Sequence, residues 1–147
     1  MARDFIYFEF PAVNSNASFA QMIASTFSCH LDASDQERQD IKTAVSEAVT
    51  NCILHAYPDR EDGIVAMELS IENQYTLRVV ICDDGVGIPN IEEAMQPLYT
   101  TRPDLECRGM GFTFMEALMD SLEVSSGVGK GTRIIMTKII NHDSTFW

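Results

Sequence analysis

The sequence of 147 residues has little positive charge and no long apolar run. Its 10 Lys and Arg stand against 22 Asp and Glu, which gives a formal net charge of −12. Nucleic acid and anionic membranes are bound through Lys and Arg that neutralise phosphates, so neither is an expected partner. No apolar stretch approaches the roughly 18 residues that a membrane-spanning helix needs. The sequence therefore predicts a soluble protein.

Cysteine is also sparse, and its spacing excludes the usual cysteine-based sites. The four cysteines stand singly and far apart, at Cys29, Cys52, Cys82 and Cys107. No CxxC pair or Cys/His spacing indicates zinc, and neither a secretory nor a myristoylation signal begins the chain. Free thiols in a reducing compartment follow, so we expect a cytoplasmic protein.

Length and composition predict one folded domain. A domain typically has roughly 100–200 residues, and a chain of this size buries about 68–70% of its unfolded surface. The hydrophobic fraction of 46% and the charged fraction of 22% are ordinary for globular proteins. We expect residues 1–147 to form a single domain without an internal repeat.

Hydrophobic periodicity predicts five strands and three helices. The clearest signal is the capping box Ser34-Asp35-Gln36-Glu37, which begins a helix that runs to about Ala56, before Pro58. Asn73-Gln74 predicts a hairpin turn. The expected strands are 5–10, 64–72, 76–82, 122–126 and 132–140, and the expected helices are 15–29, 35–56 and 112–119. This order predicts an α+β fold with helices on one face of a mostly antiparallel sheet.

A row of three polar residues lies on the long predicted helix. Glu47, Asn51 and His55 are spaced i, i+4, i+8, along one edge of the apolar stripe. A carboxylate can act as a general base, and an amide oxygen can bind Mg²⁺. The alternative is a solvated helix flank with a packed histidine.

Three glycine-containing segments could approach a ligand closely. Asp83-Asp84-Gly85-Val86-Gly87-Ile88-Pro89 follows a strand, where a carboxylate can accept from an amino group, although a simple turn explains it equally well. Arg108-Gly109-Met110-Gly111-Phe112 begins a helix, whose free amides suit phosphate. Gly129-Lys130-Gly131-Thr132 leads into the last strand. None of them is a Walker A loop or a dinucleotide fingerprint, and the HRD and DFG motifs of protein kinases are absent.

The order and spacing of these motifs together resemble the GHKL superfamily of ATP-binding proteins. Within it, three segments are similar to the anti-sigma factor kinases of sporulation and stress responses: Ser46-Glu47-Ala48-Val49-Thr50-Asn51, Pro97-Leu98-Tyr99-Thr100-Thr101-Arg102-Pro103 and Gly109-Met110-Gly111-Phe112. The resemblance spans nearly the whole chain. It implies the Bergerat fold, a two-layer α/β sandwich with a mostly antiparallel mixed sheet, and an ATP lid at about residues 96–108.

The resemblance also implies a role for each matching residue, with ATP and Mg²⁺ as cofactors. Glu47 would be the general base toward a partner's serine, and Arg108 would lie near the γ-phosphate as the second catalytic residue. Asn51 would hold the Mg²⁺, and Asp83 would accept from the adenine amino group. The other implied nucleotide-binding residues are His55, Gly85, Gly87, Ile88, Thr100, Thr101, Gly109, Met110, Gly111, Phe112 and Thr132.

The implied function combines an anti-sigma factor with a serine-protein kinase. Such a protein, as a homodimer, holds a sporulation sigma factor inactive with ATP and phosphorylates an anti-anti-sigma factor on serine. An ATP-dependent binding module without kinase activity is an alternative, because Cys107-Arg108 stands where close relatives read Arg-Ser. A stress-response anti-sigma kinase is another, because Gln21 replaces a frequent arginine.

Two further functional hypotheses are a histidine-phosphorylating domain and a purely structural protein. A detached sensor-kinase domain that phosphorylates histidine would be expected to follow a helical hairpin with a phosphoacceptor histidine, and the first predicted strand has none before it. A purely structural protein would show no stabilisation by nucleotide.

Overall fold

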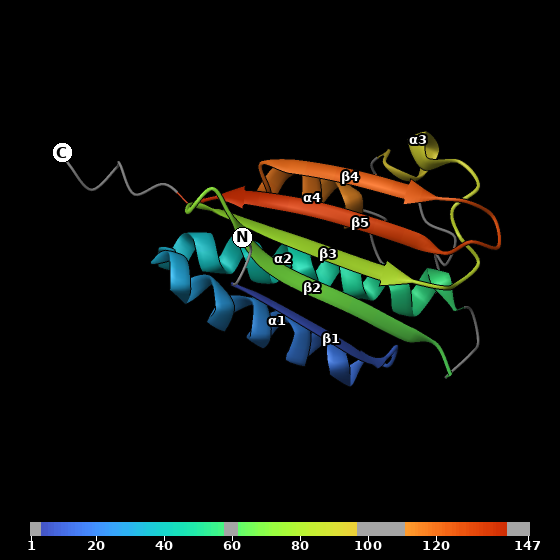
Figure 1. The fold of residues 1–147 in the computed structure, drawn as a ribbon. Coiled ribbons are helices and arrows are strands. Elements are labelled where there is room, and N and C mark those ends of the chain that lie inside the picture. Colours follow the sequence, from blue (N-terminus) through green and yellow to red (C-terminus); the bar gives the residue numbers. More distant parts are fainter. Residues whose placement is uncertain (1–3, 58–61, 97–110, 141–147) are drawn as a thin grey trace.

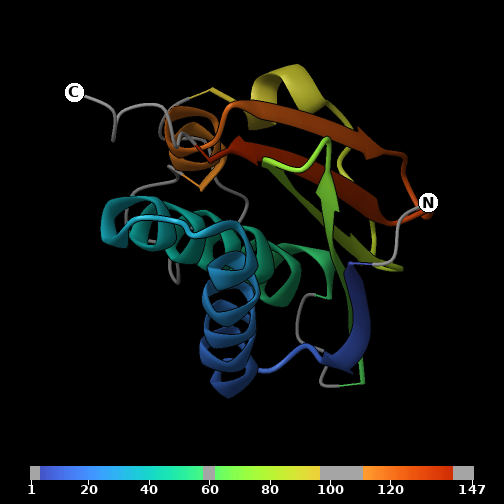
Figure 2. The same ribbon diagram turned by 60° about the vertical axis from the view of Figure 1, so that its left-hand side comes forward.

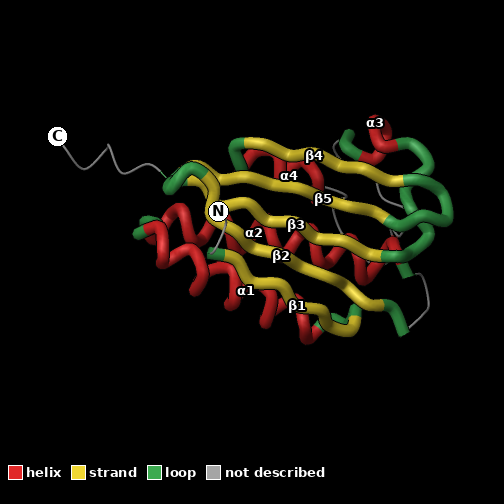
Figure 3. The backbone as a smooth tube through the Cα atoms, in the orientation of Figure 1, coloured by secondary structure: helices red, strands yellow, loops and turns green. Residues whose placement is uncertain are grey.

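The computed structural model describes residues 4–57, 62–96 and 111–140, which form a five-stranded sheet covered by helices. The strands are β1 (Phe5–Pro11), β2 (Ile64–Glu72), β3 (Thr76–Asp83), β4 (Ser121–Ser126) and β5 (Thr132–Ile139), in the spatial order β1-β2-β3-β5-β4. Each described pairing is antiparallel, and the strands run side by side in Figures 1 and 3. The predicted antiparallel sheet is confirmed.

The longer helices pack against one face of this sheet, as Figure 2 shows from the side. The helical segments are α1 (Ser15–Ser28), η1 (Cys29–Leu31), α2 (Asp35–Asn51), η2 (Cys52–Ala56), α3 (Ile91–Ala94) and α4 (Gly111–Leu118). Together with the sheet, α1, α2 and α4 make the two layers that the sequence predicts.

The core lies between the two layers and follows the alternation of the strands. Every second residue of β2 and β3 faces the helices and is buried, for example Val65, Met67 and Leu69 on β2. From the other layer, α2 contributes Ile41, Ala44, Val45, Ala48 and Val49, all fully buried. This stripe fixes the rotation of α2, and therefore the side on which its polar residues lie.

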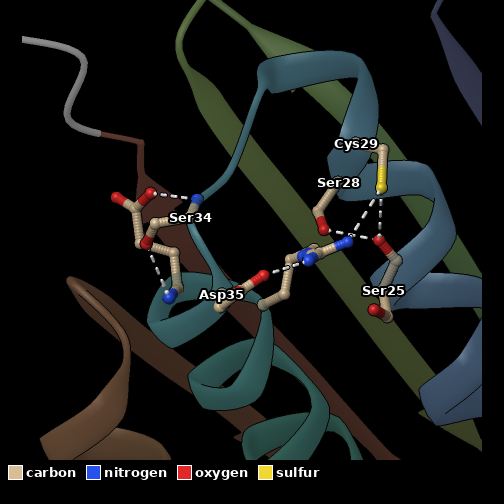
Figure 4. A network of polar contacts seen from close by, with 7 residues as sticks. Ser25, Ser28, Cys29, Ser34 and Asp35 are labelled. Atoms are coloured by element: carbon tan, nitrogen blue, oxygen red, sulfur yellow. Dashed lines mark hydrogen bonds and ion pairs between the residues drawn. The ribbon is translucent and has the colours of Figure 1, made fainter.

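The predicted capping box starts α2. The Ser34 hydroxyl accepts from the Glu37 amide at 3.0 Å, and the Glu37 carboxylate accepts from the Ser34 amide at 2.9 Å. Figure 4 shows these bonds beside a second group of contacts, in which Arg38 donates to Asp35 and to the sulfur of Cys29. The cap stabilises the start of α2 by about 1 kcal/mol, and the Arg38–Cys29 contact joins that start to η1.

The structure differs from the sequence-based elements in four places, one of which is the short 3₁₀ helix η1 after α1. The last five residues of the long helix, Cys52–Ala56, form a π-helix, which hydrophobic periodicity does not distinguish from an α-helix. The short helix α3, capped by the Asn90 side chain on the Glu93 amide, was not predicted. Strand β1 extends through Pro11, which an edge strand tolerates because proline lacks only the donor.

The expected hairpin turn is confirmed. Asn73 and Gln74 both have positive φ, 52° and 70°, as a type I′ turn requires at its two central residues.

No helix within residues 4–57, 62–96 and 111–140 is long and apolar enough to cross a membrane. The predicted lid, 96–108, lies outside the described residues except for Gln96.

Candidate functional site

Three strand ends bring polar side chains together at one end of the sheet. Asp83, the last residue of β3, pairs with Thr132, the first residue of β5, and Thr132 pairs with Ser126, the last residue of β4. Directly opposed residues of antiparallel strands project from the same face, so these three form a row across the sheet. The row continues the helix-facing side, where the apolar core ends.

Asp83 is the central group of this row. Its side chain is only 7% exposed, and its Oδ1 accepts from the Gly85 amide at 2.9 Å and from the Thr132 amide at 3.2 Å. Burial raises the pKa of Asp83 above its ordinary value, while the two amides and the Cys52 thiol act in the opposite direction. A carboxylate offers about four lone-pair positions, so Asp83 can still accept from an amino group of a ligand.

The loop after β3 packs backbone against backbone, which is why it needs its glycines. A Cβ on Gly85 would lie 2.2 Å from the Ala56 carbonyl oxygen, at the end of η2. The neighbouring Val86 amide donates to that same oxygen at 2.9 Å. Gly87 has a φ of +81°, and a Cβ there would lie 2.0 Å from the Gly127 carbonyl oxygen. The loop is thus held between the end of the long helix and the β4–β5 turn.

Two residues that sequence reasoning missed complete this end of the site. The Ser126 hydroxyl accepts from the Ile88 amide at 2.7 Å. Tyr57 is 4% exposed, and its hydroxyl accepts from the Asp84 amide at 2.8 Å and donates to the Ile64 carbonyl at 2.7 Å. A serine at a strand end and a tyrosine after a helix carry no local signal for such contacts, because their partners are distant in the sequence.

The second half of the site lies where α2 meets the start of α4. The Nδ2 of Asn51 is buried and has no hydrogen-bond partner among the described residues. A Cβ on Gly111, the first residue of α4, would lie 3.3 Å from that nitrogen and 3.4 Å from the amide oxygen. The Asn51 amide therefore faces a helix start, whose unpaired amides suit an anion.

This arrangement fits a phosphate with a divalent cation. The Asn51 amide can present its oxygen to Mg²⁺ and its nitrogen to a phosphate oxygen. Within the described parts of the chain, no group of three or more His, Cys, Asp and Glu residues could hold a metal ion. Mg²⁺ in proteins commonly takes one or two side-chain ligands and shares the rest with substrate phosphates and water, which a single amide oxygen beside a phosphate would suit.

The other two members of the predicted helical row are half-buried. Glu47 lies one turn before Asn51 on α2, as predicted. His55 falls in the π-helical segment, where hydrogen bonds join residues five apart. The i, i+4 spacing expected for one continuous α-helix therefore does not apply unchanged between Asn51 and His55.

Of the remaining predicted site residues, Ile88 and Phe112 are described. Phe112 is 8% exposed and belongs to the hydrophobic core, so what it offers a ligand is its backbone. The predicted residues that lie outside the described ones are Thr100, Thr101, Arg108, Gly109 and Met110.

Comparison with protein families gives one match that spans most of the chain. Residues 10–138 match the histidine kinase-like ATPase domain. An anti-sigma F factor of Clostridium beijerinckii is 51% identical over 133 residues, which is 90% of this chain and 92% of that protein. An anti-sigma F factor of Clostridium perfringens is 52% identical over 134 residues, covering 90% of this chain and 94% of that one.

Solved structures show the same fold. The RsbU and RsbW domains of a Mycobacterium tuberculosis protein superpose with a TM-score of 0.64 at 20% identity, over 92% of this chain and 32% of that one. The blue-light activated histidine kinase of Erythrobacter litoralis gives a TM-score of 0.57 at 28% identity, over 78% of this chain and 34% of that one.

Gly129 and Gly131 form a matched pair for testing the backbone packing around Asp83. Their φ values are +75° and +76°, but a Cβ on Gly129 meets nothing within 4 Å, whereas one on Gly131 would lie 2.0 Å from the Asp83 carbonyl oxygen. Gly129→Ala should cost only the left-handed backbone strain, about 1–2 kcal/mol. Gly131→Ala should cost about 1–3 kcal/mol more, because the end of β3 must move. Urea unfolding of both variants measures the difference, and equal losses of stability would contradict the packing described here.

Asp83 should reduce stability at neutral pH. Burial raises the pKa of Asp83 in the folded state, so the folded chain binds the proton more tightly than the unfolded chain. The contribution of Asp83 to the free energy of unfolding therefore declines as pH rises from the unfolded-state pKa of about 3.9 through the folded-state pKa. Asp83→Asn keeps an oxygen for the Gly85 and Thr132 amides and removes the buried charge. We expect a larger free energy of unfolding than wild type at pH 7. The difference should shrink as pH falls through the folded-state pKa of Asp83 and be absent below about pH 3.9.

The exposed neighbour provides the control for this prediction. Asp84→Asn should change the free energy of unfolding much less, because Asp84 carries no comparable burial. Urea unfolding between pH 3 and pH 8 would be measured for both variants. If Asp83→Asn is less stable than wild type at every pH, the cost assigned to the buried charge is wrong.

Proposed function

Because this chain belongs to the family of histidine kinase-like ATPase domains and is a relative of the anti-sigma F factors, we propose that it is an anti-sigma factor with serine-protein kinase activity. It binds ATP and a sigma factor, and it transfers phosphate to a serine of an anti-anti-sigma factor. The structural observation that supports ATP binding most directly is the buried Asp83 carboxylate beside its glycine loop.

The adenine base occupies the end of the site formed by the strand ends. Asp83 accepts a hydrogen bond from the exocyclic amino group, and the Thr132 amide keeps the carboxylate in place. Gly85 and Gly87 let the base approach the backbone, and Ile88 provides an apolar side chain. The support for this assignment is the close packing of both glycines, where any side chain would collide with the backbone.

The phosphates occupy the end of the site between α2 and α4. Asn51 holds Mg²⁺ through its amide oxygen, and the Gly111 and Phe112 amides at the start of α4 donate to phosphate oxygens. Mg²⁺ neutralises charge on the phosphates when it is bound. The unpartnered Asn51 nitrogen beside Gly111 supports this assignment. His55, Thr100, Thr101, Gly109 and Met110 complete the proposed nucleotide-binding set.

Glu47 is the proposed general base. It lies one helical turn from Asn51, so a base and the phosphate end of the site share one rigid helix. Glu47 takes the proton from the serine hydroxyl, the serine oxygen bonds to the γ-phosphorus, and ADP leaves. Arg108 is proposed to stabilise the γ-phosphate during this transfer, in which positioning and neutralisation of charge dominate.

The proposed protein partners are a sigma factor of the sporulation F type, an anti-anti-sigma factor and a second copy of this chain, all in the cytoplasm. Exposed apolar side chains on α1 and β1 are candidate contact surfaces: Phe19 is 61% and Met22 62% exposed, and Phe5 is 55% and Tyr7 54% exposed. The net charge of −12 favours association with a basic partner.

The full chain, labelled ATP, Mg²⁺ and an anti-anti-sigma factor test the kinase. We expect phosphoserine on the partner with wild type, and at least about a 100-fold slower reaction with Glu47→Gln, because general base catalysis is lost. ATP binding by Glu47→Gln should stay within about twofold of wild type, since the fold and the phosphate contacts remain. Glu123→Gln, an exposed position on β4, is the control that should react normally.

The outcomes separate the alternative functions. Wild-type rates for Glu47→Gln would contradict its role as the base. ATP-dependent co-purification of the sigma factor without any phosphoserine would identify a binding module that lacks kinase activity. Phosphohistidine on a partner would contradict the serine kinase.

A further inference from the structure

Ser126 joins both sides of the proposed base pocket through one hydroxyl. Its Oγ lies 2.7 Å from the Ile88 amide nitrogen, 2.9 Å from the Gly131 carbonyl oxygen and 2.8 Å from the Thr132 hydroxyl. Ile88 belongs to the loop after β3, whereas Gly131 and Thr132 belong to the β4–β5 hairpin. Ser126 therefore connects these two segments.

The donors and acceptors around Ser126 allow only one arrangement that satisfies all three contacts. A serine hydroxyl has one proton to donate and two lone pairs to accept with. The Gly131 carbonyl can only accept, so it takes the Ser126 proton. The Ile88 amide donates to one lone pair, and the Thr132 hydroxyl must donate to the other.

This arrangement decides what Thr132 can offer to a ligand. With its proton directed to Ser126, the Thr132 hydroxyl has only acceptor capacity left. Its backbone amide already donates to Asp83 at 3.2 Å, and Asp83 is itself an acceptor. The two residues therefore present acceptors and no free donor at this end of the site.

Ser126 also restrains the loop that follows β3 and contains Gly85, Gly87 and Ile88. Besides the Ile88 bond, this loop and the hairpin are joined by the Gly129 amide, which donates to the Val86 carbonyl at 2.8 Å. Without the Ser126 hydroxyl, the Ile88 amide would lose its partner at the position where the apolar wall of the pocket begins. An unpaired polar group of this kind weakens the geometry that binds the base.

We propose that Ser126 is a positioning residue that makes the pocket select a base with an exocyclic amino donor, such as adenine, over a base with a carbonyl at that position. It acts through Thr132 and Ile88 and does not touch the nucleotide. An amino group donates to the acceptors of Asp83 and Thr132, whereas a carbonyl oxygen would meet only lone pairs. This inference rests on the proposed ATP binding.

The test measures the affinity of the full chain for three nucleotides with Mg²⁺: ATP, GTP and purine riboside triphosphate, which lacks the 6-amino group. Isothermal titration would compare wild type with Ser126→Ala, Ser126→Thr and Ser125→Ala. Ser125 is the matched control, since it is the neighbouring serine of β4 and is exposed. Thermal unfolding of each variant establishes that it is folded, and Ser126→Cys replaces Ser126→Ala if the latter does not fold.

We expect Ser126→Ala to bind ATP about tenfold more weakly, the equivalent of one lost hydrogen bond, and to lose part of its preference for ATP over GTP, because Asp83 still accepts from the amino group whereas the Thr132 hydroxyl becomes free to donate. Its affinity for purine riboside triphosphate should fall less than its affinity for ATP, since the loosened Ile88 loop affects both nucleotides but no amino group is recognised in the analogue. Ser126→Thr, which keeps a hydroxyl, should retain the preference for ATP, and Ser125→Ala should match wild type.

Two results would overturn the proposal. One is an unchanged preference for ATP over GTP in folded Ser126→Ala. The other is an equal loss of affinity for all three nucleotides, which would indicate a structural role alone. If wild type binds none of the three nucleotides, the proposed function itself fails, and the role of Ser126 fails with it.

Discussion

A buried carboxylate that must remain an acceptor is the constraint on which this end of the molecule depends. Asp83 is 7% exposed at the end of β3, and two backbone amides, from Gly85 and Thr132, hold one of its oxygens. Burying a charge costs free energy unless hydrogen bonds compensate it, and here burial still raises the pKa of Asp83. Groups whose pKa is perturbed by burial cluster at functional sites.

The surrounding backbone follows from that requirement. The amides that reach Asp83 come from a loop and from a neighbouring strand, so β3, β5 and the loop must end at the same place. Gly87 and Gly131 permit this approach, because a side chain at either position would collide with a carbonyl oxygen. The long helix links the two halves of the site. Asn51, the last residue of α2, lies against Gly111 at the start of α4, and Ala56, the last residue of η2, lies against Gly85 in the loop after β3.

Local signals in the sequence predicted most of the elements and singled out Asp83, Asn51 and the loop glycines as candidates, but they did not predict the contacts between distant segments. The Ser34 capping box and the Asn73-Gln74 turn depend on neighbouring residues, and both are confirmed. The π-helix at Cys52–Ala56 could not be predicted, because its apolar pattern resembles that of an α-helix. Ser126 was missed because its three partners are brought to it only by the sheet and the loop.

The central proposal is that the base binds at the strand ends beside Asp83 and that the phosphates bind between α2 and α4. A crystal structure of the full chain with an ATP analogue and Mg²⁺ tests this most directly. We expect the adenine amino nitrogen at about 2.7–3.2 Å from the Asp83 carboxylate, a normal hydrogen-bond distance, with the phosphates between Asn51 and the start of α4. A nucleotide bound elsewhere, or an adenine whose amino group points away from Asp83, would contradict it.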